Sequence, residues 1–186
     1  MRIFAALSLP DKALEALEPY FEFLKSNYRG LKPVQPKGLH ITLHFFGELN
    51  PGQVQDLITL MNTSSALKRP PIDTVLLGLE QFPPKGQPRV IYTPLGQGSS
   101  DIINFQKTYL KEISGLGYRP EQKRDSKVHI TLARNKFARV PAGSLDKFIY
   151  EPFEFSLDKF VLFESRLTPR GAHYTALEEV ELTRYY

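Results

Sequence analysis

Cysteine is absent from the 186 residues of this sequence. Without cysteine, the chain has no disulfide framework, no thiolate nucleophile and no zinc or iron–sulfur site with cysteine ligands. Long hydrophobic runs are missing as well. The first apolar stretch, residues 3–9, is far shorter than a membrane span and lacks the small-residue cleavage pattern of a signal peptide. We therefore expect neither a membrane segment nor a secretion signal, and we expect a cytoplasmic location.

The excess of positive over negative charge is also small. The chain has 24 Lys and Arg against 20 Asp and Glu, which gives a net charge of +4. Such a mild excess is compatible with an anionic or nucleic-acid substrate but indicates little alone. Hydrophobic residues make up 41% and charged residues 24% of the chain, as in folded globular proteins, so a disordered chain is excluded. The length fits one domain, and we expect a monomer.

Hydrophobic periodicity predicts strands and helices in mixed order. Predicted strands cover residues 2–9, 39–47, 72–81, 89–95 and 128–133, one or two lie within 148–162, and a last one lies at 172–177. Predicted helices cover residues 11–27, 51–65 and 99–113, the first capped by Asp11 and kinked or delayed by Pro19. Because some connections are hairpin-short and others are helical, this order indicates an α+β fold with mostly antiparallel sheets.

One tetrapeptide occurs in both halves of the chain, as His40-Ile41-Thr42-Leu43 and as His129-Ile130-Thr131-Leu132. Side chains alternate along a strand, so the His and Thr of each motif share one face, about 6–7 Å apart. The Ile and Leu face the other way, into a core. The repeat predicts one domain over residues 1–186, built from two similar lobes related by a pseudo-twofold axis. Two sheets would form a central cleft between the motifs, with helices on the outside.

Two histidines and two threonines gathered in one cleft suit phosphoryl chemistry. Imidazoles on opposite sides of a phosphate can serve as base and acid near neutral pH, because histidine titrates near pH 6.5. Two hydroxyls can hydrogen-bond the non-bridging oxygens and hold the phosphorus in line. This arrangement requires no metal and no cofactor.

The paired motifs resemble those of the 2H phosphoesterases. Nearly the whole chain resembles the RNA 2′,3′-cyclic phosphodiesterase branch, historically called 2′-5′ RNA ligase. Its first strand resembles the start of this chain, with Arg2, Phe4 and Ala6, and its C-terminal segment resembles residues 162–174. One departure is visible: members commonly have Trp seven residues before the first motif His, where this chain has Pro33. That departure weakens any inference of substrate stacking at this position.

The resemblance implies an enzyme that hydrolyses terminal 2′,3′-cyclic phosphates on RNA or nucleotide ends to 2′-phosphomonoesters, without a metal. His40 would be the proton donor to the leaving ribose oxygen, and His129 the proton acceptor from the attacking water. Thr42 and Thr131 would bind the phosphoryl oxygens. The reverse reaction, a 2′-5′ ligation, would be minor because it needs a second bound RNA end.

Three more residues are candidates for substrate binding. Arg134 lies on the face opposite His129 by strict alternation, but a strand end or a bulge could turn it towards phosphate; a structural salt bridge is the alternative. Phe46 shares the face of His40 by the same alternation and could stack a base, which leaves Phe45 in the core. Tyr174 lies in the C-terminal segment that resembles the family.

Other polar residues receive weaker interpretations. His44 shares the face of His40 by alternation, and we expect it to make a peripheral contact, while His173 is expected at the surface. A metal row of His40, Thr42 and His44 is disfavoured because the second half supplies only His129. Residues 121–126 are a predicted polar loop, and the basic run of Lys123, Arg124 and Lys127 either attracts an RNA backbone or is a solvated surface.

Two alternative functions remain open at the level of sequence. One is an RNA-end binding module without useful turnover, although binding alone does not need two titratable groups. The other keeps the fold and changes the substrate, to 2′-5′ oligonucleotides or small cyclic nucleotides.

Overall fold

The computed structural model describes residues 1–118, 127–168 and 171–183, and every strand pairing within these ranges is antiparallel. The first four-stranded sheet has the order β10 (Gly171–Glu181), β9 (Lys159–Thr168), β1 (Arg2–Ser8) and β3 (His40–Glu48). The second has the order β2 (Leu31–Pro33), β7 (His129–Asn135), β6 (Val90–Pro94) and β5 (Glu80–Phe82). A separate two-stranded ladder joins β4 (Ile72–Leu76) to β8 (Phe153–Leu157). The predicted antiparallel α+β fold is therefore confirmed.

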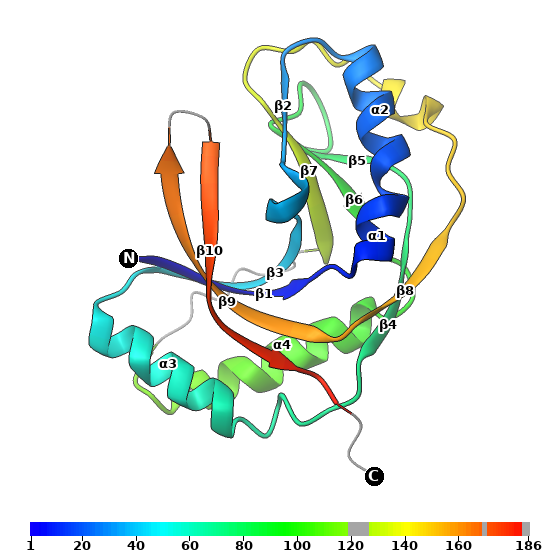
Figure 1. Ribbon diagram of the computed structural model, residues 1–186. Helices are drawn as coiled ribbons and strands as arrows, with labels where there is room; N and C mark the ends of the chain where they lie inside the picture. The colour runs from blue at the N-terminus through cyan, green and yellow to red at the C-terminus, as the bar shows by residue number, and fades with distance from the viewer. Residues whose placement is uncertain (119–126, 169–170, 184–186) are drawn as a thin grey trace.

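In the described part of the chain, four α-helices lie on the outer sides of these sheets (Figure 1). They are α1 (Asp11–Ala16), α2 (Glu18–Asn27), α3 (Pro51–Thr63) and α4 (Ser99–Ser114), accompanied by two 3₁₀ turns at Pro36–Gly38 and Ser144–Lys147. Helices α3 and α4 cover one face of the first sheet, and α1 and α2 flank the second (Figure 1). None of the helices in the described ranges is long and apolar enough to cross a bilayer.

The helix predicted over residues 11–27 is divided at Leu17. Pro19 lies in the first turn of α2, where its missing N–H costs no helical hydrogen bond, so a new helix begins there. The prediction that Asp11 caps the first helix is wrong, because Pro10 is the N-cap residue and Asp11 lies inside the first turn. There its carboxylate still faces the positive end of the helix dipole.

The strand predicted over residues 72–81 is also divided, and its two parts belong to different sheets. The chain turns at Leu77, whose carbonyl accepts hydrogen bonds from the Tyr20 and Thr93 hydroxyls, the latter at 3.0 Å. A Cβ at Gly78 would lie 2.7 Å from the Tyr150 ring, so a larger residue here would have to displace that ring. These contacts join distant segments, and local periodicity therefore did not indicate the break. Strand β2 lies in a segment for which local periodicity predicted neither a strand nor a helix.

The two repeated motifs lie in β3 and β7, one in each four-stranded sheet. Their Ile and Leu side chains are buried, with exposed fractions of 1% for Ile41, 4% for Leu43 and 0% for Ile130 and Leu132. The alternation expected within each tetrapeptide is therefore confirmed, and strands β3 and β7 contact each other across the two sheets.

Candidate active site

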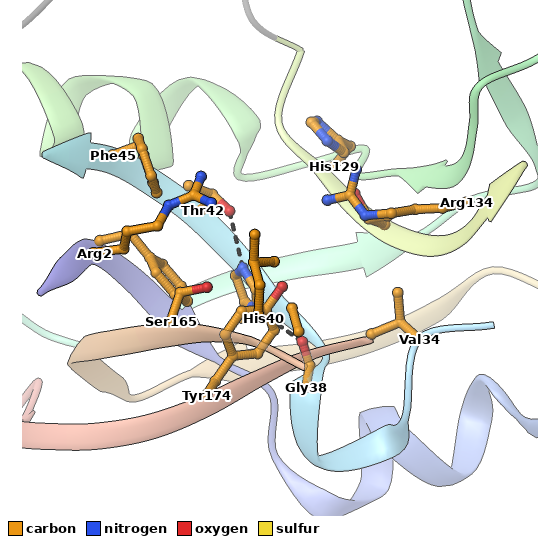
Figure 2. A pocket seen from close by; sticks show the side chains of 14 residues that line it. Arg2, Val34, Gly38, His40, Thr42, Phe45, His129, Arg134, Ser165 and Tyr174 are labelled. Atoms are coloured by element: carbon orange, nitrogen blue, oxygen red, sulfur yellow. Dashed lines mark hydrogen bonds between the residues drawn. The ribbon is translucent and has the colours of Figure 1, made fainter. Parts of the chain in front are cut away.

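A pocket of about 420 Å³ lies where the two sheets meet. Both histidines and both threonines of the repeated motifs line it, together with Arg134. Figure 2 shows His40, Thr42 and Phe45 on one side of the pocket and His129 and Arg134 on the other. The remaining wall comes mainly from the first sheet, with Arg2, Phe4, Ser165, Leu167, Ala172 and Tyr174.

The His40 ring is fixed by hydrogen bonds at both nitrogens. Its Nδ1 lies 2.8 Å from the carbonyl oxygen of Gly38, and its Nε2 lies 3.0 Å from Thr42 Oγ1 (Figure 2). Because a carbonyl can only accept, Nδ1 is the nitrogen that carries the proton in the neutral ring. Nε2 then accepts from the Thr42 hydroxyl. Aromatic rings enclose the imidazole, with centroid distances of 4.8 Å to Phe4 and 5.3 Å to Tyr174.

This enclosure lowers the pKa of His40 from its usual 6.5 to about 4. Burial is the largest cause, because it disfavours the charged ring, and the nearby His129 and Arg134 act in the same direction. The hydrogen bond to Gly38 opposes them. In the free protein, His40 is therefore neutral at pH 7.

His129 repeats part of this arrangement. Its Nδ1 lies 2.7 Å from the carbonyl oxygen of Lys127, which, like Gly38 for His40, is the residue two positions before the histidine. The neutral ring is again protonated at Nδ1, and its Nε2 is free to accept a proton. The imidazole packs against Tyr92 and Phe82, with centroid distances of 5.0 and 5.8 Å.

A β-bulge follows the threonine of each motif. Thr42 pairs with Ala6 and His44 with Ala5, so Leu43 is an extra residue in β3. Leu132 is the extra residue in β7 in the same way, because Thr131 pairs with Tyr92 and Ala133 with Ile91. An extra residue inverts the alternation beyond it. The fifth residue after each histidine is thereby brought onto the histidine face, and these residues, Phe45 and Arg134, both line the pocket.

The bulge at Leu43 corrects the prediction for Phe46. Phe45, not Phe46, lines the pocket, and 46% of Phe45 is exposed. Phe46 packs against the core and contacts His44, at a centroid distance of 4.6 Å. Because of the same bulge, His44 lies on the strand face opposite His40. Burial lowers the pKa of His44. The bulge at Leu132 turns Arg134 towards the pocket, as the interpretation as a phosphate-binding residue requires.

Sequence reasoning assigned no role to Arg2, which also lines the pocket. Its guanidinium carbon lies 5.2 Å from the centre of the Phe45 ring, a cation–π contact. Only the likeness of the first strand to the family contained a signal for this residue. Lys123 and Arg124 of the basic run lie outside the described residues, whereas Lys127 forms an ion pair with Glu80 at 2.8 Å.

The residues that the structure describes contain no group of three or more His, Asp or Glu side chains that could hold a metal ion. The polar groups of the pocket are instead two imidazoles, hydroxyls and the guanidinium groups of Arg2 and Arg134. Such groups can transfer protons and bind an anion.

Two H-x-T motifs facing one pocket from two antiparallel sheets place the protein in the class of two-histidine phosphoesterases. The comparison with family models agrees, because the model of the LigT-like phosphoesterases matches residues 7–92 and 95–174. The chain belongs to this family.

Individual relatives extend this likeness over almost the whole chain. An RNA 2′,3′-cyclic phosphodiesterase of Thermus thermophilus is 32% identical over 185 residues, which cover 98% of this chain and 90% of the relative. One of Archaeoglobus fulgidus is 30% identical over 183 residues, covering 97% of this chain and 100% of the relative. A crystal structure of a Thermus thermophilus protein superimposes with a TM-score of 0.79, at 30% identity and 98% coverage of both chains.

Proposed function

We propose that this protein hydrolyses terminal 2′,3′-cyclic phosphates on RNA and leaves 2′-phosphomonoesters. The observation that carries this proposal is that one pocket receives two imidazoles, each held by its Nδ1–H so that Nε2 is available for proton transfer. The relatives described as RNA 2′,3′-cyclic phosphodiesterases support the substrate. An RNA-binding module would not need two histidines held in this way.

In the proposed reaction, His129 Nε2 takes a proton from water as the water oxygen attacks phosphorus. The bond from phosphorus to the ribose 3′-oxygen breaks, and that oxygen receives the proton of His40 Nε2. The Thr42 and Thr131 hydroxyls and the Arg134 guanidinium bind the non-bridging oxygens, where negative charge increases in the transition state. The product keeps the phosphate on the 2′-oxygen.

The low pKa of His40 means that this donor must gain its proton together with the substrate. In the free site, His129 and Arg134 oppose a positive charge on His40. A bound cyclic phosphate is an anion and offsets this repulsion, so binding favours the protonated ring. The Thr42 hydroxyl, which donates to Nε2 in the free site, then becomes available for a phosphoryl oxygen.

Phe45 takes over the base-stacking role that the sequence assigned to Phe46. Its ring is exposed and lines the pocket, and Arg2 contacts it. An aromatic surface beside a phosphate site suits an unpaired terminal base. Tyr174 contacts the His40 ring at right angles, with an interplanar angle of 89°, and we propose that it keeps the donor in place.

The proposal is tested with an RNA oligonucleotide that ends in a 2′,3′-cyclic phosphate. The product should be the 2′-phosphate, and activity should persist in EDTA because no step uses a metal. His40→Ala and His129→Ala should each lower kcat/KM by about 10² to 10⁴-fold, the usual size of one acid–base contribution. Preferred turnover of 2′-5′ oligonucleotides or small cyclic nucleotides would change the substrate class, and binding without turnover would contradict the proposal.

A second experiment separates the two histidines. A nitrophenyl phosphodiester has a leaving group that does not need a proton, so it should restore turnover by His40→Ala. His129→Ala should stay slow, because the water still needs a base. Rescue of His129→Ala instead would reverse the assignment of acid and base.

Three finer statements rest on the sequence alone. We propose that the whole chain forms a single domain of two similar lobes, that it acts as a cytoplasmic monomer, and that ligation of a cyclic phosphate to a 5′-hydroxyl is a minor reverse reaction. Size-exclusion chromatography with light scattering tests the monomer. A mixture of cyclic-phosphate and 5′-hydroxyl RNA tests the ligation, which should give a junction that alkali cleaves but that a ribonuclease specific for 3′-5′ bonds leaves intact.

A further inference from the structure

A carboxylate that does not line the pocket connects the residues that hold His129. The Oε2 atom of Glu80 accepts hydrogen bonds from the Tyr92 hydroxyl at 2.7 Å and from Lys127 Nζ at 2.8 Å. Both donor residues contact His129: the Lys127 carbonyl accepts its Nδ1–H, and the Tyr92 ring packs on the imidazole. One carboxylate oxygen thus ties together the hydrogen bond and the packing surface of this histidine.

The strand register extends the same connection to the threonine of the motif. Glu80 in β5 pairs with Tyr92 in β6, and Tyr92 pairs with Thr131 in β7. Phe82, also in β5, stacks on Tyr92 with a centroid distance of 4.6 Å and contacts the edge of His129. The row across three strands therefore ends at Thr131, and the rings of Tyr92 and Phe82 contact His129 beside it.

The charges of this cluster are stable at neutral pH. Partial burial raises the pKa of Glu80, but the hydrogen bonds from Lys127 and Tyr92 and the Lys127 charge more than offset it, so the pKa is lowered. Burial, and then the contact with Glu80, raise the pKa of Tyr92, which therefore keeps its hydroxyl proton. The carboxylate thus accepts hydrogen bonds from both neighbours at neutral pH.

His40 is held in a different way. Its carbonyl partner, Gly38, closes a 3₁₀ turn, and its ring lies among Phe4, Phe163 and Tyr174. Aromatic packing holds the first histidine, whereas the second bonds the backbone carbonyl of a lysine whose side chain forms an ion pair with Glu80. The Lys127 side chain is 61% exposed, so without Glu80 this side chain would be free to move.

We propose that Glu80 is a positioning residue for His129, which keeps the ring protonated at Nδ1 and its Nε2 directed into the pocket. It acts through the Lys127 carbonyl and the Tyr92 ring and does not touch the substrate. The kinetic part of this inference rests on the proposed function, in which His129 is the base. A misplaced base loses rate because proton transfer requires hydrogen-bond distance to the attacking water.

The kinetic experiment compares Glu80→Gln with Glu179→Gln in the whole protein. The glutamine keeps the size of Glu80 and an acceptor for Tyr92, but it removes the charge that holds Lys127. Glu179→Gln is the matched control. It removes another exposed ion pair, which Glu179 forms with Lys159 in the first sheet at a distance of 3.0 Å. We expect Glu80→Gln to lower kcat on the order of 10-fold with KM within about 2-fold, a smaller loss than removal of the base itself. The control should match the wild type.

A second measurement does not depend on activity. Nitrogen NMR of the His129 ring should show the proton on Nδ1 in the wild type and shared between Nδ1 and Nε2 in Glu80→Gln. Lys127→Met should give the same change and add little to Glu80→Gln in the double variant, because the two residues act as one unit. An unchanged tautomer in Glu80→Gln would overturn the proposal, even if the variant were slow or less stable. If the wild type turns over no cyclic phosphate, the proposed function fails, while the tautomer still tests Glu80.

Discussion

Histidine side chains with the same neighbours in sequence differ here in their surroundings. Both motifs read His-Ile-Thr-Leu, and in both the ring donates from Nδ1 to the carbonyl two residues earlier. Burial and two nearby basic side chains lower the pKa of His40 to about 4. The proton-donor role proposed for His40 is therefore a property of the complex with an anion, which the free protein does not show.

This difference predicts a titration that depends on ligand. The ring protons of His40, followed by NMR in the free protein, should titrate near pH 4, well below the usual 6.5. Saturation with a nucleoside 2′-phosphate should raise this pKa by one unit or more, because an adjacent opposite charge shifts a pKa by about 1–3 units. The same ligand added to Thr42→Ser serves as a control that keeps the hydroxyl. A pKa near 6.5 in the free protein, or no rise on binding, would contradict this account of the donor.

The adjacent phenylalanines give a second prediction at the residue scale. Phe45→Ala should raise KM for a cyclic-phosphate RNA by about 10-fold, since stacking of one base contributes about 1–3 kcal/mol. Phe46→Ala should leave KM within about 2-fold and lower stability instead, because its ring packs on the core. Steady-state kinetics and thermal unfolding of the two variants give the comparison. The reverse pattern would restore the assignment made by simple alternation.

Within the strands and helices, hydrophobic periodicity predicted those features that depend on residues close in sequence. The buried Ile and Leu of the two motifs, the strand that each motif occupies and the apolar stripe of α3 all follow from periodicity. The bulges in β3 and β7 do not, because an extra residue is defined by pairing with β1 and β6, which are distant in sequence. The same reason explains why β2, the break at Gly78 and the position of Arg2 were missed.

Helix α3 supplies a prediction for an element whose start was predicted well. The Asn50 side chain accepts from the Gln53 N–H, and the Gln53 side chain accepts from the Asn50 N–H, both at 2.9 Å. Asn50→Ala should lower the free energy of unfolding by about 1 kcal/mol, the typical value of such a cap. Asn50→Asp should keep most of it, and chemical denaturation measures both. Equal stabilities for wild type and Asn50→Ala would mean that packing alone holds this helix end.

At the scale of the whole molecule, the half-buried His40 links stability to pH. Its folded pKa is lowered, so between pH 6.5 and about 4 the unfolded chain binds a proton that the folded protein excludes. Stability from this group is therefore complete above pH 6.5 and decreases as pH falls towards 4, by roughly 1.4 kcal/mol per pH unit. The free energy of unfolding of His40→Asn, measured by urea denaturation, should depend less on pH in this window. Parallel curves for the two proteins would exclude the linkage.

The two bulges make the two halves of the pocket chemically different. Each half of the molecule offers the pocket a histidine, a threonine and then a fifth residue, but that residue is aromatic in one half and cationic in the other. A terminal nucleotide is polar in the same sense, with a flat base at one end and an anion at the other. In the proposed function it would bind with its base on Phe45 and its phosphate beside Arg134. This orientation would determine the histidine beside each ribose oxygen and hence the ester bond that opens. Exchange of the two residues, as Phe45→Arg with Arg134→Phe, is expected to reverse the bound nucleotide and to yield the 3′-phosphate.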